Sequence, residues 1–98
     1  MKFDRISNDA IKTLDRVGLG GALNEIAALL DSADGRGKHS DRGWFDIMMP
    51  ELHSKAYRHL KDAECDDAVD HDSGMLASLH AAARCLMIAQ RQILWRDL

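Results

Sequence analysis

The sequence has few of the residues and runs that build disulfide frameworks, extended sheets or membrane spans. Only one proline and two cysteines occur among its 98 residues, and aromatic residues make up 5% of the chain. No apolar run approaches the roughly 18 to 20 residues that cross a bilayer. The charged stretch from Met1 to Arg5 has no apolar core, so we expect no signal peptide. These absences predict a cytoplasmic protein without membrane contact.

The cysteines and the charge also limit the class of protein. Cys65 and Cys85 lie far apart and form no Cys-x-x-Cys pair, which favours free thiols over a disulfide. The formal net charge of −3 argues against a general nucleic-acid binder, whose surface is usually basic. A nucleotide pocket with a few local cations remains compatible with this charge.

Apolar residues recur at helical spacing in four stretches, and no stretch alternates convincingly between apolar and polar residues. Most of the seven glycines are clustered between positions 18 and 43, where they separate the helices. Ser7 or Asn8 can cap a short first helix, and the other three predicted helices cover residues 22–32, 50–63 and 74–95. The sequence therefore predicts an all-α fold.

The last two predicted helices are joined by a short polar loop. Pro50 fits the first turn of the third helix, where its missing N–H costs nothing. Asp72 or Ser73 is expected to cap the fourth. Because short connections favour antiparallel neighbours, these helices should form a C-terminal hairpin within a small four-helix arrangement. We predict a single domain over residues 1–98, whose thin core favours a homodimer.

The loop before the fourth helix is the strongest local cluster of charge. It holds five acids in nine residues, Glu64, Asp66, Asp67, Asp70 and Asp72. Closely spaced carboxylates repel one another unless a cation neutralises them, and Mg²⁺ and Mn²⁺ prefer such oxygen ligands. A solvated, helix-capping loop is the structural alternative, and an EF-hand does not fit because the closing Glu is missing.

Two histidines flank this loop on the neighbouring helices. His59 lies near the end of the third helix and His80 near the start of the fourth, so a hairpin would point both toward the acids. A metal or acid/base role is one interpretation. The other is that of ordinary buried histidines bonded to backbone or carboxylate groups.

Cations and an aromatic residue complete a possible nucleotide site. Arg58, Lys38 and Arg42 are candidate phosphate contacts, arginine because of its forked donors. Trp44 could stack on a base. Exposed arginines and lysines are common, however, and a tryptophan after a loop often anchors a core.

Several short stretches of the sequence are informative because of their order and spacing. They are residues 2–6, 38–44, Arg58-His59-Leu60, residues 66–74 and His80-Ala81-Ala82. Together they resemble a family of small phage and bacterial domains, the N-terminal domain of dATP/dGTP diphosphohydrolase. That family has an Arg-His-Leu helix, a loop Gly-Glu-Asp-x-Asp-x-Glu-Ser-Gly and a closing His-Leu-Ala-His-Ala helix. Here Asp66-Asp67 replaces Gly-Glu, Asp72 replaces the later Glu, and Ala77 replaces the first His.

The resemblance implies metal-dependent cleavage of a deoxynucleoside triphosphate between its α and β phosphates, releasing a monophosphate and pyrophosphate. In that scheme Asp67, Asp70 and Asp72 hold Mg²⁺ or Mn²⁺, and His59 or His80 is a ligand or base. The phosphates contact Arg58, Lys38 and Arg42.

Two alternative functions follow from these departures from the family pattern. Ala77 removes a candidate ligand, and no second acidic pair lies upstream at the spacing that helical pyrophosphohydrolases use. The chain could therefore be a nucleotide-binding module without catalysis. It could also be a small phage-encoded interaction protein that inhibits a host defence complex, as anti-CRISPR proteins do.

Overall fold

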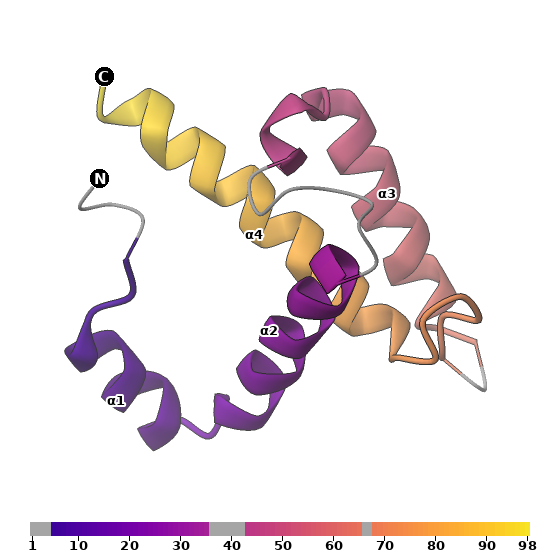
Figure 1. Cartoon of the computed structure of the whole chain (residues 1–98), viewed down its shortest axis with the longest axis horizontal. Coiled ribbons are helices and arrows are strands. Elements are labelled where there is room, and N and C mark those ends of the chain that lie inside the picture. The colour runs from indigo at the N-terminus through magenta and orange to yellow at the C-terminus, as the bar shows by residue number, and fades with distance from the viewer. Residues whose placement is uncertain (1–4, 36–42, 66–67) are drawn as a thin grey trace.

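The protein folds into helices arranged around a long C-terminal one (Figure 1). The computed structural model describes residues 5–35, 43–65 and 68–98. The elements are α1 (Asn8–Arg16), α2 (Gly20–Gly35), the 3-10 helix η2 (Gly43–Asp46), α3 (Met49–Asp62) and α4 (Ala77–Arg96). Within the described ranges the extended pairing consists of one isolated bridge between Val69 and Leu76. The all-α prediction with four α-helices is confirmed.

Helix starts follow the predicted capping signals in two cases and depart from them in one. The Ser7 hydroxyl caps α1 by accepting the Ala10 N–H at 3.1 Å, and Pro50 lies in the first turn of α3. The predicted cap of α4 at Asp72 or Ser73 is wrong, because α4 begins later, after Leu76. Leu76 makes no side-chain cap. The polar groups before it bond among themselves, as the next subsection shows.

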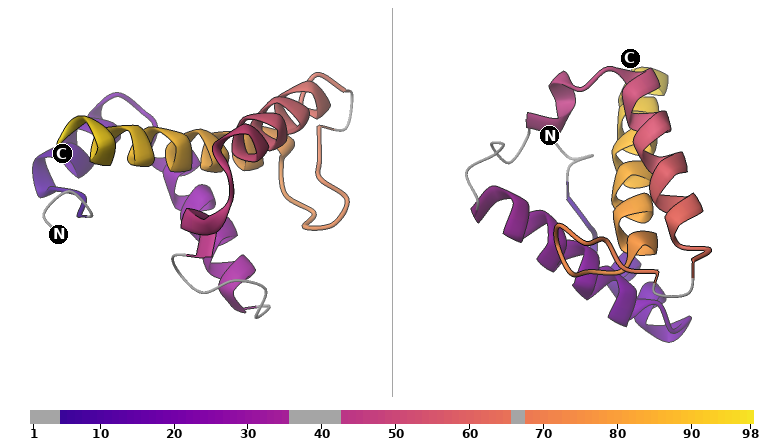
Figure 2. Two further views of the ribbon diagram at one scale, coloured as in Figure 1. Left: turned by 90° about the horizontal axis from the view of Figure 1, so that it is seen from above. Right: turned by 90° about the vertical axis from the view of Figure 1, so that its right-hand side faces the viewer.

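Helices α3 and α4 form the predicted C-terminal hairpin and lie side by side in the views of Figures 1 and 2. From α3, the side chains of Leu52, Ala56 and His59 are buried, at the spacing of one helix face. Helix α2 crosses the first half of α4, where Ile26 and Leu29 pack against residues of α4 in a small apolar cluster. The start of α4 is thereby held from two sides.

Helix α1 lies at the far end of the fold from α3 (Figure 1). It contributes no buried side chain, and Ile11 and Val17 remain exposed. A homodimer, which the thin core suggested, would cover such a face, and it stays a prediction. In the part of the chain that the structure describes, no helix combines the length and apolar character needed to cross a bilayer.

A buried arginine fixes η2 against α4. The Arg91 side chain donates to the backbone oxygens of Trp44, at 3.2 Å, and Phe45. Its guanidinium lies 5.9 Å from the centroid of the Trp44 ring, and that ring stacks on Phe45 with centroids 4.0 Å apart. This contact joins residues more than forty positions apart and closes the fold around the second half of α4.

Replacing Arg91 with alanine is expected to lower the free energy of unfolding by about 2 kcal/mol, because two carbonyls lose a charged donor. Urea unfolding followed by far-UV circular dichroism measures the change. Gln92→Ala on the exposed side of the same helix is the matched control and should leave stability nearly unchanged. Equal stabilities of the two variants would contradict the anchoring role.

Candidate functional site

Residues 68–77, which lead into α4, form a turn closed by backbone hydrogen bonds. The Asp70 N–H donates to the Met75 carbonyl, the Gly74 N–H to the Asp70 carbonyl, and the Ala77 N–H to the Ala68 carbonyl, each at 2.8 Å. Gly74 has φ +73°, a left-handed conformation that glycine adopts without a Cβ penalty. The turn therefore has a defined shape that places its side chains over the start of α4.

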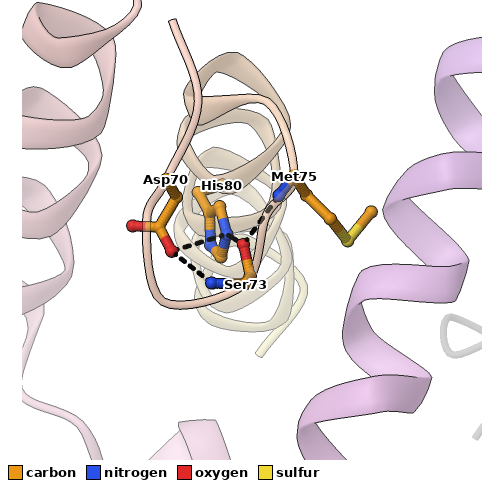
Figure 3. A network of polar contacts seen from close by, with 4 residues as sticks. All are labelled: Asp70, Ser73, Met75 and His80. Atoms are coloured by element: carbon orange, nitrogen blue, oxygen red, sulfur yellow. Dashed lines mark hydrogen bonds and ion pairs between the residues drawn. The ribbon is translucent and has the colours of Figure 1, made fainter.

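Three polar side chains meet inside this turn (Figure 3). The Asp70 Oδ2 atom accepts the Ser73 N–H at 3.0 Å. The Ser73 hydroxyl accepts the Met75 N–H at 3.1 Å and lies 2.7 Å from His80 Nε2. The same His80 nitrogen is 3.6 Å from Asp70 Oδ2. The acidic loop is thus joined to α4 through the contacts of His80 with Ser73 and Asp70.

A second histidine packs on the first. The rings of His59 and His80 stack with centroids 4.8 Å apart and planes inclined by 25°. His59 is 7% exposed, and its Nδ1 atom is buried without a hydrogen-bond partner among the described residues. An unpaired buried ring nitrogen is costly, which is typical of a site that a ligand or water completes.

The protonation states of the site follow from its surroundings. Burial lowers the pKa of His59 below its ordinary value of 6.5, and the positive charges of His80, Arg58 and Arg84 lower it further against the effect of Asp70. Burial alone would raise the pKa of Asp70, but hydrogen bonds from Ser73 and the nearby histidines outweigh it, so this pKa lies below 3.8. At neutral pH the site therefore holds a neutral His59 beside an ionised Asp70.

An open pocket of about 450 Å³ lies at this end of the hairpin. Its walls come from the last turns of α3 and from the loop, and the lining residues are Arg58, His59, Asp62, Cys65, Val69, Asp70, His71 and Asp72. Four residues predicted as site residues therefore meet at one pocket, namely Arg58, His59, Asp70 and Asp72. His80 joins them through its contacts with His59 and Asp70.

The sequence matches the family model described as dATP/dGTP diphosphohydrolase, N-terminal, over residues 5–96. The chain belongs to this family. The match confirms the resemblance seen in the sequence and places the chain in a family of nucleotide hydrolases. Neither the curated proteins nor the solved structures contain a significant match to the chain.

Not every residue that the sequence predicts for the site is brought to the pocket. Trp44 does not line it and instead packs on Phe45 and Arg91. The candidate residues Lys38, Arg42 and Asp67 lie outside the described residues. Their predicted roles therefore stay predictions, as does the base-stacking role of Trp44.

The metal ligands predicted for this diphosphohydrolase domain are placed only in part. Asp70 and Asp72 line the pocket, and the second carboxylate oxygen of Asp70 points away from the polar network in Figure 3. Across residues 5–35, 43–65 and 68–98, no group of three or more His, Cys, Asp and Glu residues is arranged to hold a metal ion. The predicted metal site includes Asp67, which lies outside the described residues, and it stays a prediction.

Two residues near the site were not among those predicted to act in it. The sequence predicts Ser73 only as a helix cap and indicates no role for Arg84. Arg84 is half-buried, its Nη1 atom lies 3.8 Å from the Met87 sulfur, and burial followed by the charge of Arg58 lowers its pKa against the effect of Glu51. The spacing of His80 and Arg84 by four residues, which places both on one helix face, was the available signal.

Acid is expected to destabilise the protein through His59. Because the pKa of His59 is lower in the folded protein than its ordinary value of 6.5, the unfolded chain binds the proton first as the pH falls. The stabilising contribution is complete above pH 6.5 and decreases as the pH falls toward the lowered pKa. The contribution of Asp70 is lost only further down, below pH 3.8.

Urea unfolding at a series of pH values from about 7.5 to about 5, which bracket the ordinary histidine pKa of about 6.5, measures this dependence. His59→Gln should flatten it, whereas His53→Gln on the exposed side of the same helix should not. A slope that survives the first substitution unchanged would show that another group is responsible.

Proposed function

We propose that the pocket binds the phosphates of a deoxynucleoside triphosphate and takes part in its cleavage between the α and β phosphates, releasing pyrophosphate. The observation that carries the proposal is the meeting of a cation, a neutral histidine and an ionised carboxylate at one pocket, in Arg58, His59 and Asp70. The name of the family favours dATP and dGTP as substrates. The pocket volume falls within the range of about 300–1,000 Å³ typical of small-ligand sites.

Each side chain has a role that its surroundings support. The exposed Arg58 offers forked donors to phosphate oxygens. His59 is neutral at pH 7 and lines the pocket, so its imidazole can accept a proton from the attacking water. Asp70 and Asp72, with Asp67, would hold Mg²⁺ or Mn²⁺, which would supply charge neutralisation at the phosphates.

The test is to incubate the purified protein with each of the four dNTPs and Mg²⁺ or Mn²⁺ and to measure pyrophosphate. We expect release from the purine nucleotides and an increase in melting temperature when nucleotide and metal are added together. The monophosphate dAMP, which lacks the β and γ phosphates, should give a smaller shift. A protein that neither releases pyrophosphate nor changes its melting temperature would contradict the proposal. A shift without release would favour the non-catalytic binding module.

The phosphate role has its own control on the same helix. Arg58→Gln should weaken dATP binding about tenfold or more, since a charge-assisted contact is worth roughly 1.5–3 kcal/mol. Lys61→Gln removes an exposed cation that does not line the pocket and should leave the dissociation constant unchanged. Equal weakening by both changes would indicate a general charge effect instead of a site. Inhibition of a host defence complex stays a separate, untested prediction.

A further inference from the structure

We infer that Ser73 is a positioning residue that links Asp70 to His80 and holds the His80 ring with its proton on Nε2. The link runs from His80 Nε2–H to the Ser73 oxygen, and from the Ser73 N–H to Asp70 Oδ2. This inference adds to the proposed function, and it depends on that function only for the expected effect on turnover. The proposed function by itself gives Ser73 no role.

The direction of each hydrogen bond follows from counting donors and acceptors. A serine hydroxyl has one proton and two lone pairs. The Met75 N–H, at 3.1 Å, uses one lone pair of the Ser73 oxygen. His80 Nε2 lies 2.7 Å away and either donates to the second lone pair or accepts the hydroxyl proton.

The Asp70 carboxylate decides between these two arrangements. It lies 3.6 Å from His80 Nε2 and is ionised at neutral pH. A negative carboxylate repels the lone pair of an unprotonated nitrogen and attracts an N–H, so Nε2 carries the proton. The Ser73 oxygen then accepts twice, and its own proton is free to go to Asp70. The hydroxyl of Ser73 is indeed among the groups whose hydrogen bonding lowers the pKa of Asp70.

This arrangement has a chemical consequence. Asp70 Oδ2 receives the Ser73 N–H, and the Ser73 oxygen contacts both the Met75 N–H and His80 Nε2. Partners that fix a histidine tautomer in this way commonly alter affinity or activity by about 10–100-fold when removed from metal sites.

The test is the ¹⁵N and ¹H NMR spectrum of the histidine rings in EDTA-treated protein, with His80 assigned through the His80→Gln variant. In the wild type we expect the Nε2–H tautomer and a slowly exchanging Nε2–H proton signal. Ser73→Ala should remove that protected signal, Ser73→Thr should restore it, and Ser78→Ala, at an exposed serine of α4, should leave it in place. A wild-type ring protonated on Nδ1 would overturn the inference, whatever the variants do.

Turnover gives a second readout that separates positioning from folding. If the wild type releases pyrophosphate, Ser73→Ala should lower kcat about 10–100-fold with little change in KM, and Ser73→Thr should recover most of it. An unchanged kcat in Ser73→Ala would overturn the positioning role. If the wild type releases none, the proposed function fails, whereas the NMR result still decides the link between Asp70 and His80.

Discussion

Asp70→Asn is expected to lower pyrophosphate release from a purine dNTP by about 100-fold or more, the usual scale for loss of a residue in acid–base or metal chemistry. Asparagine cannot carry the negative charge that Asp70 presents to His80 and to a bound cation. Its amide oxygen can still accept the Ser73 N–H, so the turn should keep its shape. The far-UV circular dichroism spectrum should therefore remain that of the wild type.

The control for this prediction is a second Asp→Asn change away from the pocket. Asp31 is exposed on α2 and does not line the site, so Asp31→Asn removes the same charge without touching the polar network. Turnover of Asp31→Asn should match that of the wild type at several metal concentrations. Retention of full activity by Asp70→Asn would place the chemistry elsewhere in the molecule.

The helices were predictable because their signals are local. Apolar spacing of three and four residues, a serine cap and a proline in a first turn lie within one or two helical turns. The predicted start of α4 is too early because serine is a residue type that commonly caps helices. Here the Ser73 hydroxyl contacts His80 instead. A cap and a site residue look alike in sequence, since both are short polar side chains before an apolar run. Only the position of His80 in space separates the two.

The centre of the site was predictable from the hairpin, but its edges were not. Once two helices pack antiparallel, His59 and His80 near the connecting loop must lie close together, and their rings do stack. Trp44 shows the limit of such reasoning. Its partner Arg91 comes 47 positions later in the sequence. No local spacing in the sequence indicates that an arginine of α4 contacts the backbone carbonyls of η2. Contacts of this kind depend on how the helices are packed as a whole.

Leu52→Ala is expected to lower the free energy of unfolding by about 3 kcal/mol, within the range of roughly 2–5 kcal/mol found for such truncations in cores. The Leu52 side chain is 0% exposed, and it is the largest completely buried side chain of the described residues. The substitution removes three carbon atoms and leaves a cavity that the surrounding helices fill only partly. A small domain has about 5–15 kcal/mol of stability in all, so the loss is large.

The loss of packing should also affect the site, because Leu52 lies on the same buried face of α3 as His59, two helical turns away. Urea unfolding gives the loss of stability, and Leu60→Ala on the same helix is the control, since Leu60 is 57% exposed. The control should cost well under 1 kcal/mol. Because folding brings His59 against His80, Leu52→Ala should weaken dATP binding at temperatures where part of the protein is unfolded and leave it unchanged at lower ones. A binding defect that persists in fully folded protein would instead mean that Leu52 shapes the pocket directly.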